Sequence, residues 1–559
     1  MSLPFQRIET TTFGGVNFSD QSPLLIQRAF EPVDGGFVQR APLESPNLIN
    51  VDFLERAIGK RKGSALLESL ASVMVASEII IAIKSWVTPG TTTEVQVAVG
   101  KLSIYTNQSG TWAQINNSGG SAYTHAANVT KCSFAEVVGH LLMGIDGANK
   151  IQVYRSGANL DASLDNGNTW NDTFGGGTST ITGTWGTAYY ILFEMHERLV
   201  FGTGNAVAEY TDVQQPWDRA NGGFRLLKGN VVGAMVFVPE GGSELNTVAF
   251  FSTTAGPIFL SGFDLTDSTK PVHGANVALN HQCLVATDKW IMYMTREGGI
   301  EAINVYDKKD LGRRLFTGDG VSGPTDTFQA TNAQHPTLPF GYYNQKKKQA
   351  MWFYPNAAGT TNSHAVVVDM FLAEGATGEQ QDLAESNTRL LYWSIVTPAT
   401  NPWFVSIYTK KGAVIGVLAT GICYTLESGL SDLDTLPIQE FYEWGDFNGG
   451  VVGRIINWRR LAGEFKEKGS WNLLVRKYLD RSTGQFGDDV SWLMASTDSS
   501  VYDTGVYDTA LYSGGAVRRA TWLEVYSREV RLRFQNQETA RDWILTGLSL
   551  EYQIGSRQD

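Results

Sequence analysis

The chain has 559 residues, 42% of them apolar and only 18% charged, a composition that indicates a globular protein and excludes a disordered one. The formal net charge is −12, which excludes a general role in coating nucleic acid because such proteins present a basic face. Glycine and aromatic residues are abundant, and both favour many short strands joined by turns.

Three scattered cysteines, Cys132, Cys283 and Cys423, offer neither a disulfide framework nor the spacing of a metal site. We therefore predict reduced, buried thiols in a protein that folds in a cytoplasm. The N-terminal stretch MSLPFQRIETTTFGGVNF lacks a basic start followed by an apolar core, so we expect no signal peptide. No apolar run reaches the length of about 18 residues that a membrane span requires, so we expect no membrane insertion.

Residues 1–63 are rich in turn formers and read as loops or an extended arm. The basic run Lys60, Arg61 and Lys62 is expected to be a solvated turn, with contact to a phosphate backbone as the alternative. Residues 64–84 have the composition of a helix, but β-branched residues favour a strand from about Ser77 onward.

From about residue 95 a strand–turn–strand pattern repeats along the chain. Its hairpins begin near residues 95, 140, 198, 248, 289, 348 and 403. Repetition at this period predicts a β-propeller of about seven blades, each a small antiparallel sheet that packs against its neighbours. Four aromatic side chains inside the repeats are expected to fill the space between blades: Trp112, Trp290, Trp352 and Trp393.

One turn within the repeats has a distinctive sequence, SLDNGNTW. It reads as a hairpin of two short strands, with Asp165 accepting backbone N–H groups, Gly167 at a positive φ and Trp170 buried. The pattern of Ser163, Asp165, Gly167, Thr169 and Trp170 resembles the Asp-box of sialidase-like and related β-propellers. We interpret it as a structural turn and not as a site of chemistry.

After Leu436 and Pro437 the chain stays rich in β-strand patterns but carries more charge. The alternating segments near its end predict a separate antiparallel β-sandwich or barrel. Arg528, Arg531 and Arg533 are expected to be solvated charges on an edge strand. The predicted organisation is an N-terminal arm that joins a platform (1–75), an all-β propeller (76–430) and a C-terminal antiparallel β domain of the platform (431–559).

Candidate catalytic groups are sparse. His196 and Glu197 lack the second histidine of a zinc-protease helix, and no phosphate-binding glycine motif or nucleophile elbow occurs. Paired carboxylates occur at Asp432 with Asp434 and at Asp488 with Asp489, and we expect them to be solvated or to cap turns. The sequence therefore predicts no catalytic residue, no cofactor and no metal site, and a protein that is not an enzyme.

Both ends of the chain resemble the tail nozzle, or tail tubular protein B, family of short-tailed bacteriophages. At the N-terminus an arm leads to the segment NVDFLERAIGKRKG (Asn50–Gly63), and at the C-terminus LEVYSREVRLRFQNQ and LTGLSLEYQIG are similar to the closing strands. The resemblance implies a hexameric structural conduit of the virion tail, assembled in the host cytoplasm. It further implies contact with a tail adaptor protein and tail fibres, and passage of genomic DNA without sequence-specific binding.

Two other functions are also compatible with the sequence. A receptor-binding or glycan-cleaving, sialidase-like propeller would present a funnel with clustered acids and exposed aromatic residues. A propeller scaffold unrelated to phage would be a monomer without a partner for its C-terminal domain.

Overall fold

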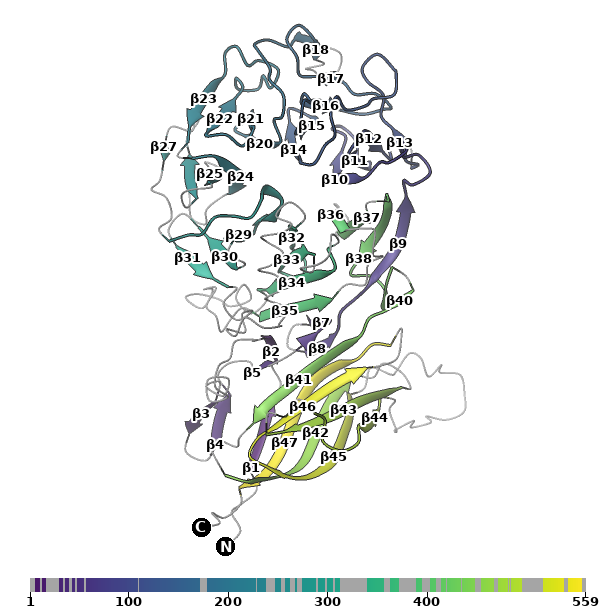
Figure 1. Cartoon of the computed structure of the whole chain (residues 1–559), viewed down its shortest axis with the longest axis vertical. Helices are drawn as coiled ribbons and strands as arrows, with labels where there is room; N and C mark the ends of the chain where they lie inside the picture. Colours follow the sequence, from purple (N-terminus) through teal and green to yellow (C-terminus); the bar gives the residue numbers. More distant parts are fainter. Residues whose placement is uncertain are drawn as a thin grey trace.

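The computed structural model defines a largely antiparallel all-β chain. It describes residues 6–10, 13–16, 30–33, 36–39, 43–45, 48–54, 57–108, 110–170, 178–227, 229–237, 247–252, 257–261, 267–268, 274–287, 290–296, 299–304, 307–311, 339–355, 362–370, 389–394, 403–408, 414–418, 420–433, 435–447, 454–466, 471–480, 482, 484–494, 516–536 and 541–554. Figure 1 shows a propeller at one end and a smaller β-sandwich, here called the platform, at the other.

Seven four-stranded antiparallel sheets form the blades of the propeller. In chain order the first six are β10 (Ile80–Val87), β11 (Glu94–Gly100), β12 (Ile104–Thr106) and β13 (Ala113–Gln114); β14 (Cys132–Val137), β15 (His140–Ile145), β16 (Gln152–Tyr154) and β17 (Ala162–Ser163); β20 (Ile191–Met195), β21 (Arg198–Gly202), β22 (Val207–Tyr210) and β23 (Gly223–Leu226); β24 (Val231–Phe237), β25 (Thr247–Ser252), β26 (Ile258–Ser261) and β27 (Asp267–Ser268); β28 (Leu284–Ala286), β29 (Ile291–Met294), β30 (Ile300–Ile303) and β31 (Lys308–Asp310); and β32 (Phe340–Asn344), β33 (Gln349–Tyr354), β34 (His364–Asp369) and β35 (Arg389–Ser394). The seventh consists of β36 (Trp403–Tyr408), β37 (Val414–Leu418), β38 (Ile422–Leu426) and β9 (Ser64–Ser69).

The ring is closed by contacts between first strands. Each of β10, β14, β20, β24, β28 and β32 contacts the first strand of the next blade, and β36 contacts β10. The last blade takes its outer strand from the N-terminal region, because β9 pairs with β38 from Ser69 opposite Ile422 to Ser64 opposite Leu426. Figure 1 shows β9 running along β38. The predicted seven-bladed propeller is confirmed. Residues 64–69 form β9 and not a helix, and the strand expected from about Ser77 is β10, which begins at Ile80.

Apolar side chains fill the spaces between blades, as the repeat pattern predicts. One cluster joins blades one and two through residues such as Val97 and Leu141, and another joins the last blade to the first through Leu70 and Ile80. The four tryptophans predicted to pack between blades, Trp112, Trp290, Trp352 and Trp393, are all buried, but Trp393 differs from the prediction because its indole faces Val51 of β7. Burial of this kind makes each blade depend on its neighbours for stability.

The platform is a sandwich of two sheets. The first has the order β45 (Ala516–Ser527), β42 (Ile456–Lys466), β47 (Ile544–Ile554), β8 (Ala57–Lys60) and β7 (Val51–Leu54), with β1 (Gln6–Thr10) also paired to β47. The second has the order β44 (Val490–Leu493), β43 (Asn472–Leu479), β46 (Val530–Asn536), β41 (Glu440–Phe447) and β6 (Leu48–Ile49). Phe465 of the first sheet meets Trp492 of the second with ring centroids 5.7 Å apart. Val51 and Ile58 of the N-terminal strands belong to the same buried cluster, so both ends of the chain build one apolar core.

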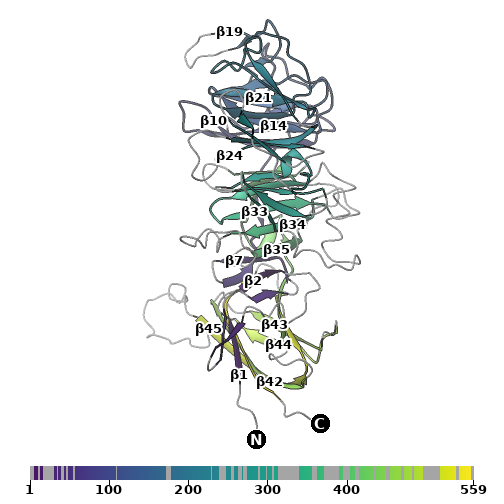
Figure 2. The same ribbon diagram turned by 90° about the vertical axis from the view of Figure 1, so that its left-hand side faces the viewer.

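Four two-stranded sheets and one short helix complete the described structure. They are β2 (Phe13–Val16) with β5 (Leu43–Ser45), β3 (Phe30–Val33) with β4 (Gly36–Gln39), β18 (Thr169–Trp170) with β19 (Ser179–Thr180), β39 (Ser431–Asp432) with β40 (Leu436–Pro437), and the 3₁₀ helix η2 (His281–Cys283). Figure 2 shows β1, the first strand, at the platform end of the molecule and away from the propeller.

Candidate functional site

The turn SLDNGNTW forms a connection between sheets and not the predicted hairpin. Ser163 ends β17, which pairs with β16, whereas Thr169 and Trp170 form β18, which pairs with β19. Asp165 Oδ1 accepts the Asn166 N–H at 3.1 Å, and Gly167 has a φ of +85°, as the motif predicts. Lys150 Nζ lies 3.3 Å from the same carboxylate oxygen, so the aspartate is held by a turn and a surface ion pair.

Trp170 is fully buried and gives this turn its structural role. Its ring packs 4.8 Å from the His140 ring and 5.8 Å from the Trp217 ring. The turn thus fixes an aromatic side chain in the core between blades two and three. The five residues of the motif do not bring several acidic or nucleophilic side chains together. They therefore support the interpretation of the motif as a structural turn.

We expect Asp165→Ala to lower the free energy of unfolding by about 0.5–1.5 kcal/mol, the net worth of one hydrogen bond and an exposed ion pair. Urea denaturation monitored by tryptophan fluorescence measures the change. The matched variant Asp165→Asn keeps an acceptor for the Asn166 N–H. It should therefore recover most of the loss, and a loss as large as that of alanine would contradict the role of the hydrogen bond.

The basic run 60–62 lies at the junction between the propeller and the platform and is mostly buried, which corrects the prediction of a solvated turn. Arg61 donates from Nη1 and Nη2 to the two carboxylate oxygens of Asp432, at 2.8 and 2.6 Å. Both side chains are almost fully buried. Asp432 is therefore half of a buried ion pair and not the solvated or turn-capping acid that we predicted, and Asp434 lies outside the described residues.

Asn50 joins this pair to both bodies of the molecule. Its N–H donates to the Tyr392 carbonyl of the sixth blade at 3.1 Å, and its Nδ2 donates to the Gln439 carbonyl beside β41 at 2.7 Å. Its Oδ1 accepts from Arg61 Nε at 2.9 Å, and its φ of +57° is one that asparagine tolerates. The backbone N–H and the side chain of Asn50 thus connect the propeller, the platform and Arg61.

Two further basic residues face acidic residues of the platform. Lys60 Nζ lies 3.7 Å from Glu440 Oε2, and neither side chain is exposed. Lys62 Nζ lies 3.0 Å from Asp542 Oδ2 in a more exposed position. Lys60 and Arg61 are thus buried against acids, and only Lys62 of the three stays partly exposed.

Burial raises the pKa of Glu440 to about 8, against the opposing effect of Lys60. The folded protein therefore binds more protons than the unfolded chain between about pH 4.5 and 8, and this contribution to stability is lost as the pH rises through that window. Burial lowers the pKa of Lys60, which acts in the opposite direction at higher pH. We expect Glu440→Gln to flatten the fall of the unfolding free energy over this window, as measured by urea denaturation at several pH values; an unchanged slope would contradict the assignment.

A second buried polar cluster supports the junction from the sixth blade. Lys347 Nζ lies 2.7 Å from Asp52 and 2.6 Å from Glu427, and against the lowering effect of burial these two carboxylates together raise the pKa of the lysine. Arg389 pairs with Asp369 at 2.9 Å, and its guanidinium lies 3.8 Å from the centre of the Phe53 ring. Sequence reasoning missed this cluster because Asp52 lies 295 positions before Lys347 and no local motif joins the members.

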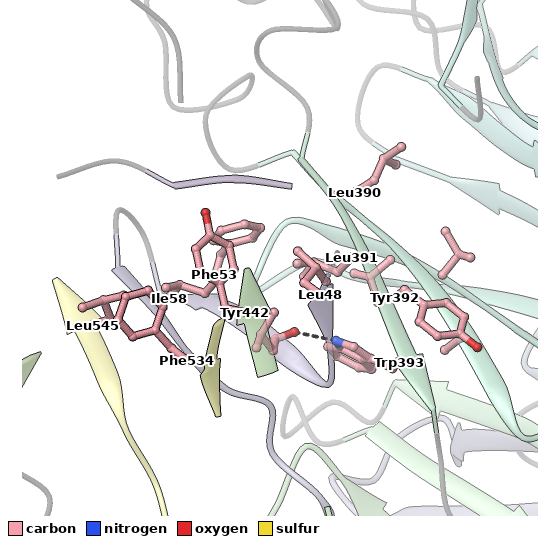
Figure 3. Close-up of a cluster of buried hydrophobic side chains, with 14 of the residues drawn as sticks. Leu48, Phe53, Ile58, Leu390, Leu391, Tyr392, Trp393, Tyr442, Phe534 and Leu545 are labelled. Atoms are coloured by element: carbon pink, nitrogen blue, oxygen red, sulfur yellow. Dashed lines mark hydrogen bonds between the residues drawn. The ribbon is translucent and has the colours of Figure 1, made fainter. Parts of the chain in front are cut away.

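Apolar side chains also pack at the junction between the propeller and the platform. Figure 3 shows Leu48 beside the β35 side chains, with Phe53 and Ile58 among side chains of the C-terminal platform strands. Trp393 of β35 donates its indole N–H to the Val51 carbonyl at 2.7 Å. The propeller and platform are therefore joined by one continuous buried cluster of apolar and polar side chains.

The C-terminal arginines differ from the prediction of edge charges. Arg531 and Arg533 lie on β46, which is flanked by β43 and β41 inside its sheet. Both make ion pairs with Glu443, at 3.4 Å for Arg531 Nη1 and 2.7 Å for Arg533 Nε. Only Arg528, in the turn before β46, is exposed.

The other candidate acids also have structural partners. Asp489 pairs with Arg476 at 3.0 Å and accepts from Gln485 at 2.8 Å, and its neighbour Asp488 is exposed. His196 and Glu197 occupy the tight turn between β20 and β21, both at positive φ. Within the described part of the chain, no group of three or more histidine, cysteine or acidic side chains is placed to hold a metal ion. Nor does any described helix have the length and hydropathy of a membrane span.

A cavity of about 320 Å³ lies beside the starts of β14, β20, β24 and β28. Its lining consists of Thr130, Lys131, Cys132, Tyr190, Gly204, Asn230, Val231, Val232, Leu279, Asn280, His281, Gln282 and Arg296. No aspartate or glutamate occurs among these described lining residues. The paired acids that glycoside hydrolysis requires are thus not found in this cavity.

No family model matches the chain, and no curated protein sequence matches it. Among solved structures, BBS1N in complex with ARL6DN, soaked with mercury, aligns with a TM-score of 0.36 and 8% identity over 66% of this chain and 97% of that chain. The exo-beta-1,3-galactanase from Phanerochaete chrysosporium with galactose aligns with a TM-score of 0.27 and 10% identity over 78% of this chain and 98% of that chain. Similarity at this level carries no argument about function.

Proposed function

We propose that this protein is a structural component of a short-tailed bacteriophage tail, a nozzle subunit through which packaged DNA is retained and then ejected. The observation that carries the proposal is the role of the segment Asn50–Gly63. This is the segment on which the resemblance to nozzle proteins depends, and its Asn50 and Arg61 make the buried contacts between propeller and platform. A segment that joins two domains through buried contacts is expected in a protein that resists mechanical force, and it requires no catalytic residue.

The mechanical properties of the fold support the proposal. A closed propeller is stiff because each blade packs on two neighbours, and here its seventh blade is completed by β9 of the N-terminal region. The same region contributes β6, β7 and β8 to the platform. Force applied to the platform is therefore transmitted to the propeller through paired strands and buried side chains.

The charge of the chain also suits a conduit. With a net charge of −12, the surface repels DNA overall, so a duplex moves past it instead of adhering. We propose that about six copies form a heterologous closed ring, with the platform in contact with an adaptor protein and with tail fibres attached to the same assembly. We place this assembly in the virion tail, after folding in the host cytoplasm.

Electron microscopy of the purified full chain, alone and with its adaptor partner, tests the proposal. We expect rings of about six subunits around an open lumen, at least when the adaptor is present, and no release of sugar from host envelope material. Single particles that never assemble and that hydrolyse envelope glycan would instead support the glycan-cleaving alternative. Monomers with neither assembly nor glycan cleavage would support an unrelated propeller scaffold.

A further inference from the structure

The cavity at the starts of β14, β20, β24 and β28 differs in charge from the molecule as a whole. The chain carries a net charge of −12, yet the charged residues that line the cavity are Lys131 and Arg296. They come from the second and fifth blades, so the fold brings them together from distant parts of the sequence. Asn230 and Gln282 add amide side chains that can donate hydrogen bonds.

Neither cation makes an ion pair with a carboxylate within the described part of the chain. Lys131 Nζ lies 4.5 Å from the centre of the Tyr190 ring, a contact that orients the ammonium group. Asp146 accepts with Oδ1 from the N–H groups of Thr130 and Lys131 at 2.8 and 3.0 Å, and its negative charge offsets only one of the two cations. The cavity therefore holds a local excess of positive charge.

The remaining walls are uncharged and fixed. Burial lowers the pKa of His281 to about 4, so this histidine is neutral at pH 7, and its Nδ1 accepts from the Ala234 N–H at 3.4 Å. Gly204 has a φ of +85°, and a Cβ at this position would clash with the Tyr190 hydroxyl. The wall beside Tyr190 thus requires a glycine.

We propose that this cavity binds a small anion, in which a carboxylate or phosphate group is carried on a polar body of about monosaccharide size. The volume of about 320 Å³ lies at the lower end of the range for small-molecule sites. Lys131 and Arg296 would make charge-assisted hydrogen bonds to the anion, while the amide side chains contact hydroxyl groups. This inference is independent of the proposed role in a phage tail, because it concerns only the propeller.

Isothermal titration calorimetry on the full chain tests the proposal with four probes: glucose 6-phosphate, glucuronate, inorganic phosphate and glucose. We expect heat of binding from the anionic probes and none from glucose. Lys131→Met and Arg296→Met should each weaken anion binding by about tenfold, which is the loss expected for one charged hydrogen bond. Arg225→Met removes an arginine of β23 that does not line the cavity and should leave the affinity unchanged.

The four probes also separate the possible sources of the anion. Tighter binding of glucose 6-phosphate or glucuronate than of inorganic phosphate would support an acidic sugar as the ligand, and equal binding would support the bare anion. Any of three results would overturn the proposal: glucose binds as tightly as the anionic probes, no anionic probe binds, or both methionine variants keep the affinity of the parent protein. Arg296 is exposed, so its variant is expected to keep the thermal stability of the parent and to report on binding alone.

Discussion

Arg61→Ala is expected to lower the free energy of unfolding by about 3–5 kcal/mol, the cost of leaving one partner of a buried ion pair without the other. In the parent protein the guanidinium satisfies both oxygens of Asp432 and also binds the Asn50 side chain. Without it, the Asp432 carboxylate stays buried beside an empty volume. Urea denaturation followed by tryptophan fluorescence measures the loss.

Two comparisons make this result specific. Lys62→Ala removes the neighbouring positive charge, whose ion pair with Asp542 is more exposed, and should cost only about 0–1 kcal/mol. The double variant Arg61→Ala with Asp432→Ala should be less destabilised than the sum of the two single variants, because no unpaired charge remains buried. Additive losses, or equal losses for Arg61→Ala and Lys62→Ala, would contradict the assignment of a buried pair.

Leu70→Ala is expected to cost about 2–5 kcal/mol because it creates a cavity where the ring of blades closes. Leu70 follows β9 and is fully buried, and it packs with Ile80 and Tyr105 of the first blade and with Val417 and Cys423 of the last. Its N–H donates to the Gly421 carbonyl at 2.8 Å. The substitution thus weakens the contact between the N-terminal segment and the two blades that it joins.

Leu66→Ala provides the matched control on β9. Leu66 is 55% exposed, and the same substitution there should change the unfolding free energy by no more than about 0.5 kcal/mol. Thermal or urea denaturation of the two variants side by side gives the comparison. Similar losses at both positions would show that closure does not depend on the buried side of this segment.

The propeller was predictable because its signal is repetitive. Six of the seven hairpins that the sequence indicates begin within two residues of the second strand of a blade, from β11 at Glu94 to β33 at Gln349. The seventh, near residue 403, begins instead at the first strand, β36. That blade receives its outer strand, β9, from about 350 residues earlier in the chain, and no local sequence pattern predicts a pairing over that separation.

The junction was not predictable from local patterns. A run of three basic residues is usually solvated, and only the fold shows that Lys60 and Arg61 face acids brought from the other end of the chain. Arg531 and Arg533 were misassigned for a related reason, since strand alternation does not reveal whether a strand lies at the edge or inside a sheet. The positive φ of Gly167 and the burial of Trp170 were predictable from the sequence of this turn. The strand pairing was not, because Thr169 pairs with Thr180 of β19 and not with the strand that ends at Ser163.

The N-terminal segment closes the propeller and fixes it to the platform as one stiff body. Native-state hydrogen exchange on the purified full chain tests this arrangement most directly. We predict that the N–H groups of β9 that pair with β38 exchange as slowly as those of β37 inside the same blade. Exchange in β9 as fast as in an exposed, unpaired segment, while β37 stays protected, would contradict the claim.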